Sequence, residues 1–272
     1  MELKYNFCII AYNKIILGQK MLDAINQSGT RIKTGLFLIG AFLTMGLIDS
    51  LFITWVLFGL LMIISVWEAM ILFKIDDSRI YTIAAAIWVV ALFYPKPEDL
   101  VFVVGVVLAS ILAYNQTLNK QLFLPLAYPI VSFLFLLSLY ISFGMSSLVW
   151  LVAIVAGADI GAYFVGKSKG KTQFCKTSPN KTTEGVMGGV ITASILGVIF
   201  SPSDIGVFAS LIISAIVAFA SVFGDLFESY LKREAGVKDS GNILPGHGGI
   251  LDRSDGYLFG GIILLVLLRM VS

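Results

Sequence analysis

Long apolar stretches separated by short polar breaks run through the chain from residue 34 to its end. Crossing the ~30 Å hydrocarbon core of a bilayer takes about 20 mostly apolar residues, with a usual range of about 17–25. Nine stretches are candidates, several of them short by that rule: 34–48, 51–73, 80–94, 100–114, 121–143, 145–166, 186–200, 205–224 and 256–271. Because lipid cannot satisfy backbone polar groups, these stretches are predicted to be helices.

The breaks between the stretches carry turn-forming residues. They lie at 49–50, 95–97, 115–120, Gly144 and 201–204. Short breaks of this kind join antiparallel neighbours. The predicted fold class is therefore all-α: a polytopic integral membrane protein with about nine transmembrane helices.

Composition supports a bilayer as the surrounding medium. Of the 272 residues 58% are hydrophobic and only 13% are charged, against about 25% charged in soluble domains. Cys8 and Cys175 lie far apart without a neighbouring Cys or His, so they indicate neither a disulfide framework nor a zinc site. Residues 1–33 mix apolar and charged positions without the long apolar core of a signal peptide. They are predicted to be an interfacial or poorly ordered extension before a single membrane-embedded domain, 34–272.

The lysines and arginines decide the direction of the spans, because they concentrate on the cytoplasmic side of membrane proteins. If the N-terminus is cytoplasmic and all nine stretches cross, 17 of the 19 cationic residues lie on the cytoplasmic side. Lys96 and Arg269 lie on the other side. Removing or adding one early span would separate the N-terminal cations from the two charged loops, 167–185 and 225–255. An N-in, C-out topology with both loops cytoplasmic is therefore predicted.

The first charged loop follows an apolar stretch that contains Asp159. A carboxylate within a span costs roughly 2.5–3.5 kcal/mol on insertion scales, so it usually faces a partner or a wet cavity. Asp159 either pairs with a lysine to hold two helices together or lies near a polar substrate. Residues 178–185 read as a helix entry that Thr182 or Thr183 could cap. With Lys181 beside it, this entry is a candidate anion site, the alternative being a solvated loop that serves topology alone.

The second charged loop is richer in chemistry. If the preceding helix extends past the membrane, Asp225, Glu228, Ser229 and Lys232 fall on one polar stripe. Glycines at 246, 248 and 249 let the backbone approach a bulky anionic ligand.

Two aspartates close this loop. Asp252 and Asp255 are three residues apart, so on a helix both can aim at one point. Carboxylate oxygens bind hard cations, and Mg²⁺ typically takes one or two of them together with phosphates and water. Nearby lysines and arginines would neutralise phosphate charge. The pattern favours phosphoryl or nucleotidyl transfer.

Two further polar residues have open roles. His247 is the single histidine and lies between glycines. It could bind phosphate, act as an acid or base, or hydrogen-bond to a loop carbonyl. Glu68 lies near the cytoplasmic end of the second span, where helix packing is the expected explanation.

At this point the residues resemble a known family, the bacterial phosphatidate cytidylyltransferases (CDP-diacylglycerol synthases). The resemblance rests on Ser229-Tyr-Leu-Lys232-Arg233, Lys238-Asp239-Ser-Gly241 and Leu244-Pro245-Gly-His247-Gly248-Gly249-Ile-Leu-Asp252-Arg253-Ser-Asp255. Upstream, Asp159-x-Gly-Ala-Tyr and Ser178-Pro-x-Lys-Thr-x-Glu-Gly are similar to further stretches of that family. With the span pattern, it covers nearly everything from Arg31 onward. Ser254 departs from the aliphatic residue or threonine usual there, and residues 1–30 have no counterpart.

The resemblance implies a Mg²⁺-dependent condensation of CTP with phosphatidic acid to CDP-diacylglycerol and pyrophosphate, with room for a second cation. It implies a multi-span homodimer in the bacterial cytoplasmic membrane with its site facing the cytoplasm; no nucleic-acid partner is expected. The implied metal ligands are Asp225, Asp252 and Asp255. The implied phosphate ligands are Lys232, Arg233, Lys238, His247 and Arg253. The residues expected to complete the substrate pocket are Asp159, Ser178, Lys181, Asp239, Gly248 and Gly249.

Within this set, Asp225, Asp252, Asp255, His247 and Lys232 are the expected catalytic residues. Replacement of Asp252 by Asn is expected to abolish turnover while leaving the protein folded.

Two other activities are the alternatives. Asp252-x-x-Asp255-Gly256 resembles the start of the CDP-alcohol phosphotransferase motif, but the continuation of that motif is missing. An ion-coupled transporter could use Asp159 and Glu68. Transporter sites tend to lie near the bilayer midplane on broken helices, whereas the charge here collects in loops.

Overall fold

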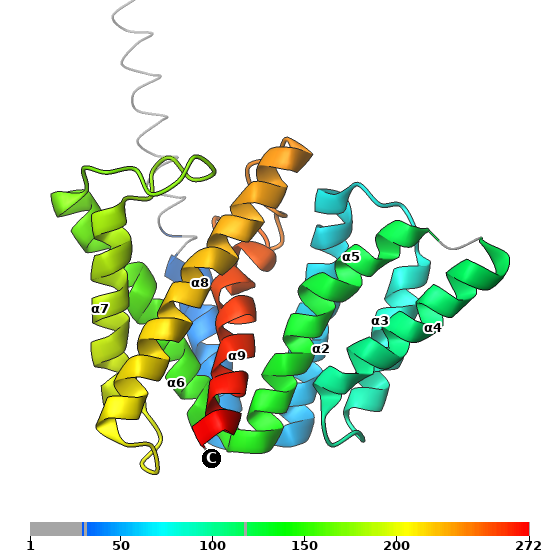
Figure 1. Ribbon diagram of the computed structural model, residues 1–272, viewed down its shortest axis with the longest axis horizontal. Coiled ribbons are helices and arrows are strands. Elements are labelled where there is room, and N and C mark those ends of the chain that lie inside the picture. Colours follow the sequence, from blue (N-terminus) through cyan, green and yellow to red (C-terminus); the bar gives the residue numbers. More distant parts are fainter. Residues whose placement is uncertain (1–28, 30–31, 117–118, 272) are drawn as a thin grey trace, which may run out of the picture.

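Helices and the loops between them account for the described chain in the computed structural model, which covers residues 29, 32–116 and 119–271 (Figure 1). The helices are Ile32–Ile48, α2 (Leu51–Phe73), α3 (Arg79–Ala91), α4 (Leu100–Asn115), α6 (Val131–Lys169), α7 (Thr183–Phe200), α8 (Val207–Ala235) and α9 (Leu251–Val271). Short helical turns are η1 (Pro97–Asp99), η2 (Lys120–Leu122), α5 (Phe123–Pro125) and η3 (Leu126–Ile130). Within the described residues, the only β-type backbone pairings are two isolated bridges. The all-α prediction is therefore confirmed.

Six helical segments of the described chain are long and apolar enough to cross a membrane. One of them, Lys120–Lys169, has 50 residues and is interrupted at Gly144, whose φ of 68° and ψ of −171° are not helical. Only glycine readily adopts that combination, which explains the predicted break there. The helices Ile32–Ile48 and Arg79–Ala91 are shorter. Each of the nine predicted stretches coincides with a helical segment, while the number that cross and their direction stay predictions.

Several helices begin or end beyond their predicted limits, and the differences at α7, α8 and α9 place charged residues on helices. The helix predicted for 205–224 continues to Ala235, and the one predicted for 256–271 begins at Leu251. The polar stripe from Asp225 to Lys232 is therefore helical, as predicted. The helix predicted from 186 begins at Thr183, and the hydroxyl oxygen of Thr182 accepts the N–H of Gly185 at 3.2 Å. Thr182 is thus the cap, one of the two candidates.

Close helix packing surrounds Asp159. α6 packs along α7, and a Cβ added at Gly189 of α7 would lie 2.6 Å from the carbonyl oxygen of Ala158 in α6. Small residues let helix backbones approach in this way within membranes. α8 packs against both α7 and α9, so these helices form the framework of the C-terminal half (Figure 1).

The two charged loops, residues 170–182 and 236–250, lie at the same end of the molecule (Figure 1). Their predicted location on one face is confirmed. The connection 201–206 and the end of α9 lie at the opposite end. There Arg269 forms an ion pair of 2.5 Å with the buried Glu98 of η1. The predicted N-terminal extension falls largely outside the described residues.

Candidate active site

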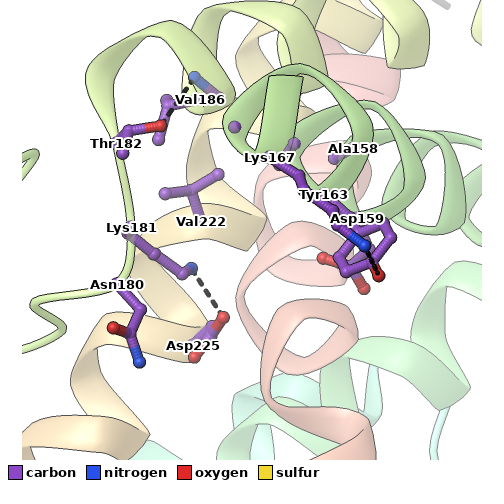
Figure 2. A pocket seen from close by; sticks show the side chains of 13 residues that line it. Ala158, Asp159, Tyr163, Lys167, Asn180, Lys181, Thr182, Val186, Val222 and Asp225 are labelled. Carbon is purple, nitrogen blue, oxygen red and sulfur yellow. Dashed lines mark hydrogen bonds and ion pairs between the residues drawn. The ribbon is translucent and has the colours of Figure 1, made fainter. Parts of the chain in front are cut away.

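A cavity of about 510 Å³ opens between α6, α7 and α8 at the loop end of the molecule (Figure 2). We call it the Asp159 cavity. Its lining comprises Ala158, Asp159, Ala162, Tyr163, Gly166, Lys167, Asn180, Lys181, Thr182, Gly185, Val186, Val222 and Asp225. Charged groups therefore share this cavity with small apolar side chains.

An ion pair joins the two charged regions across the Asp159 cavity. The ammonium of Lys181, just before α7, lies 2.5 Å from Oδ2 of Asp225 on α8 (Figure 2). The hydroxyl of Ser229 donates to the other oxygen of Asp225 at 3.3 Å. On the opposite wall, Lys167 lies 5.6 Å from the centre of the Tyr163 ring. Residues more than 40 positions apart in the sequence thus meet at one cavity.

A second cavity, of about 700 Å³, is formed by the loop after α8 and the start of α9. We call it the His247 cavity. Its lining comprises Lys238, Asp239, Asn242, Leu244, Pro245, Gly246, His247, Gly248 and Arg253. The guanidinium of Arg253 donates through Nε to the carbonyl oxygen of His247 at 3.0 Å.

The imidazole of His247 has a buried nitrogen, Nδ1, with no hydrogen-bond partner among the described residues. The backbone N–H of His247 donates to Leu244 O at 2.9 Å, which fixes the turn. The buried Nδ1 makes no contact with a loop carbonyl among the described residues, and the backbone carbonyl of His247 accepts the guanidinium of Arg253. His247 remains a candidate phosphate ligand or acid–base group.

Asp252 is almost fully enclosed by donors from its own loop and from α8. Its Oδ1 accepts the Lys232 ammonium at 2.6 Å. Its Oδ2 accepts the N–H groups of Ser240 and Gly249, each at 2.8 Å, and lies 3.0 Å from the Ser240 hydroxyl. Lys232 also contacts the buried Glu228 at 2.6 Å. Asp252 and Lys232 therefore position the loop, and binding a metal or a phosphate would require them to exchange these partners.

The predicted metal ligands were Asp225, Asp252 and Asp255. Within the described ranges, no three His, Cys, Asp or Glu side chains lie close enough together to hold a metal ion. Asp255 accepts one hydrogen bond, from the N–H of Gly256 at 2.9 Å, and Asp159 accepts none from the described residues. Carboxylate oxygens are the ligand type that divalent cations prefer, so the donor chemistry is suitable while the predicted ligand set stays a prediction.

Six predicted site residues line neither cavity: Ser178, Lys232, Arg233, Gly249, Asp252 and Asp255. The carbonyl of Ser178 accepts the N–H of Lys181 at 3.0 Å, so Ser178 shapes the turn that presents Lys181. Arg233 is exposed near the end of α8, and its carbonyl accepts the N–H of Gly236 at 3.2 Å. Their predicted contacts with substrate stay predictions.

The structure adds three polar residues that sequence reasoning left aside or assigned differently. Glu228 is buried beside Lys232, and Ser240 is buried between two carboxylates. Glu68 was expected to serve helix packing, but its carboxylate accepts the N–H groups of Ile250 and Leu251 at the start of α9. A carboxylate within an apolar span was the available signal for Glu68; its partners, about 180 positions away, were not visible in any local pattern.

The fold and the two cavities define a multi-pass membrane protein whose site, at one end of the helices, suits a ligand bearing phosphate groups. A family model described as the cytidylyltransferase family matches residues 29–271, and the chain belongs to that family. The predicted resemblance is thereby confirmed.

Named relatives agree with this assignment. The chain is 42% identical over 258 residues to a phosphatidate cytidylyltransferase of Helicobacter pylori strain J99, covering 93% of this chain and 96% of the relative. It is 41% identical over 255 residues to the protein of the same name from strain 26695, with the same coverage. A Bacillus subtilis phosphatidate cytidylyltransferase is 46% identical over 134 residues, 48% of this chain and 50% of the relative.

Proposed function

We propose that this chain is a phosphatidate cytidylyltransferase, which joins CTP to phosphatidic acid and releases CDP-diacylglycerol and pyrophosphate. The observation that carries the proposal is the likeness along almost the whole chain to a relative of that name, 42% identical over 93% of the chain. The two cavities supply the geometry, since one is lined mainly by polar and basic groups and the other mixes charge with apolar surface.

The His247 cavity suits the triphosphate of CTP. Lys238, Arg253 and His247 line it, and cationic donors are the groups that bind phosphate oxygens most strongly. Its loop lies beyond the apolar helices, at the end of the molecule away from the predicted bilayer core (Figure 1). A water-soluble nucleotide would reach this cavity directly.

The Asp159 cavity suits the phosphate of the lipid. Ala158, Ala162, Val186 and Val222 form apolar walls beside Lys167 and Lys181. The helices that form it carry large exposed apolar side chains, Tyr163, Met187 and Phe223 among them. Exposed apolar groups on spanning helices face lipid. A phosphate at the membrane surface could enter here with its acyl chains remaining in the bilayer.

The reaction needs little covalent chemistry from the protein. An anionic oxygen of the lipid phosphate attacks the α-phosphorus of CTP, and the bond between that phosphorus and the oxygen bridging to the β-phosphate breaks. Pyrophosphate leaves with the electron pair. Because the nucleophile is already charged, rate enhancement comes mainly from in-line positioning and from charge stabilisation by the basic side chains.

Mg²⁺, which the family resemblance implies, usually takes one or two protein carboxylates together with substrate phosphates and water. Asp225 and Asp255, both among the predicted ligands and brought together where Gly224 packs on the Asp255 backbone, would supply them. When bound, the ion would neutralise negative charge on the phosphates. Asp252 would help to position these carboxylates indirectly, through its contacts with Lys232 and with the backbone of Gly249. Location in the bacterial cytoplasmic membrane, a cytoplasmic site and a homodimer belong to the same proposal.

The direct test is incubation of the purified chain with CTP, phosphatidic acid and Mg²⁺. We expect equimolar CDP-diacylglycerol and pyrophosphate. An intact protein that releases no pyrophosphate, but converts CDP-diacylglycerol and an alcohol to phospholipid and CMP, would show the phosphotransferase instead. Ion-driven solute uptake by proteoliposomes, again without pyrophosphate, would indicate the transporter.

The same assay tests the division between the cavities. Lys238→Ala should raise KM for CTP about tenfold and leave KM for phosphatidic acid near its normal value, because one charge-assisted contact is lost. Lys167→Ala should do the reverse. Equal effects of both variants on both KM values would contradict the division without contradicting the activity.

A further inference from the structure

We propose that Glu68 is a positioning residue for the nucleotide, one that fixes the His247 cavity from inside the membrane region without touching substrate. The inference rests on the proposed function. Glu68 lies on α2 and its side chain is fully buried. It lines neither the Asp159 cavity nor the His247 cavity.

Glu68 caps α9 from a different helix. Its Oε1 accepts the N–H of Ile250 at 2.9 Å, and its Oε2 accepts the N–H of Leu251 at 2.8 Å. The first N–H groups of a helix have no partners within the helix, and negative charge is favourable at that end. Glu68 therefore supplies α9 with both acceptors and charge, and α9 begins where these contacts place it.

The same carboxylate holds the other end of the loop. The hydroxyl of Ser240 lies 3.0 Å from Oε2 of Glu68 and 3.0 Å from Oδ2 of Asp252. Asp252 accepts the N–H groups of Ser240 and Gly249 in turn. The two carboxylates thus bind the loop at Ser240, where it leaves the Lys238 region, and at 249–251, where it enters α9.

Two glycines of the loop leave room for the Glu68 carboxylate because they have no side chain. A Cβ added at Gly241 would lie 2.5 Å from Oε1 of Glu68, and one added at Gly249 would overlap both carboxylate oxygens. The loop backbone is therefore packed directly on Glu68 at two places. Between those two places lie His247 and most of the residues that line the His247 cavity.

This geometry makes the position of the basic groups depend on a residue about 180 positions earlier. Arg253 is in the first turn of α9, and its guanidinium holds the carbonyl of His247. A shift of α9 or a loosening of the loop would move Arg253, His247 and Lys238 relative to one another. Loss of Glu68 should therefore weaken nucleotide binding, although the nucleotide never meets it.

The experiment compares Glu68→Gln with Glu98→Gln in the purified full chain. Glu98 is also a buried carboxylate, but it pairs with Arg269 at the opposite end of the molecule. Three quantities are measured for each: KM for CTP, the midpoint of thermal unfolding, and the rate of tryptic cleavage after Lys238. We expect Glu68→Gln to raise KM for CTP about tenfold and to speed that cleavage about tenfold. Glu98→Gln should lower the unfolding midpoint with neither effect.

Two results would overturn the proposal. One is a Glu68→Gln protein whose KM for CTP and cleavage rate match the wild type. The other is a rise in both quantities that Glu98→Gln reproduces at an equal loss of stability, since this would show a purely structural role. Ser240→Ala, which removes one hydroxyl, provides the milder variant if Glu68→Gln does not fold, and should change both quantities about threefold.

The cleavage measurement separates this proposal from the proposed function. If the wild-type chain lacks cytidylyltransferase activity, the tryptic rate still reports whether Glu68 holds the loop. If activity is present but Glu68→Gln changes neither the cleavage rate nor KM for CTP, the proposed function stands and the positioning role is contradicted.

Discussion

At the scale of single residues, Asp252 shows how a residue of the family signature can act through its neighbours. Its two oxygens are occupied by Lys232, by the backbone of Ser240 and Gly249, and by the Ser240 hydroxyl. A buried carboxylate with so many donors is stabilised in its charged form. Its removal would affect both the loop and the ammonium of Lys232, whose other partner is Glu228.

Asp252→Asn should therefore lower turnover more than about 100-fold and also reduce stability by about 1–3 kcal/mol. The amide keeps an acceptor for the loop but leaves Lys232 with a single carboxylate. Turnover with CTP and phosphatidic acid and the thermal midpoint in detergent measure the two effects. Asp204→Asn, at the opposite end of the molecule, is the control and should change neither. Turnover close to normal in purified Asp252→Asn would contradict the role.

The sequence identified most of the charged residues that line the two cavities, but it could not identify how they are connected. Asp225, Lys181, Asp159 and Arg253 stand out because charge is rare in so apolar a chain. The pairing of Lys232 with Asp252, 20 positions away, and of Glu68 with the start of α9 depends on how distant helices pack. Such contacts have no periodicity in the sequence. Local patterns therefore single out the residues but do not predict their partners.

At the scale of helices, the pattern of apolar residues predicted where the helices lie. The pattern of charged residues was needed to find where they end. Hydropathy marks the part of a helix that lies in lipid. α8 continues to Ala235 as an amphipathic helix, and α9 begins at Leu251, ahead of its apolar part. Asp225 and Asp252 are in these extensions. The break at Gly144 was predictable because glycine stands between two long apolar runs.

Gly144→Ala tests whether that break depends on glycine. The residue has a φ of 68° with nothing near its missing side chain, so any cost is conformational. We expect a loss of about 1–3 kcal/mol in stability, followed by thermal unfolding in detergent. Gly105→Ala, in the middle of α4 with equally open surroundings, should be neutral or raise stability by about 0.5–1 kcal/mol. Equal midpoints for both variants would show that the break is not held by glycine.

At the scale of the whole molecule, both charged loops share one end (Figure 1), and the distribution of cations predicts that this end is cytoplasmic. The loop 170–182 contains Cys175, which is partly exposed. The connection 201–206 lies at the opposite end and contains the exposed Ser203.

Cysteine labelling measures this sidedness. In a Cys8→Ser background, a membrane-impermeant maleimide should modify Cys175 in inverted membrane vesicles and leave it unmodified in intact spheroplasts. A Ser203→Cys, Cys175→Ser protein should show the opposite pattern. Labelling of Cys175 from outside spheroplasts would reverse the predicted topology and with it the side from which CTP must arrive.

The contact between Glu68 and the glycines of the loop also has a consequence for how these positions can change in evolution. Gly241 and Gly249 leave no room for a side chain because Glu68 fills that space, so the two regions are constrained together although a long stretch of sequence separates them. In chimaeras that exchange the first two helices between relatives, we expect cytidylyltransferase activity only where the donor carries a carboxylate at this place. Selection would then act on these distant codons as one unit.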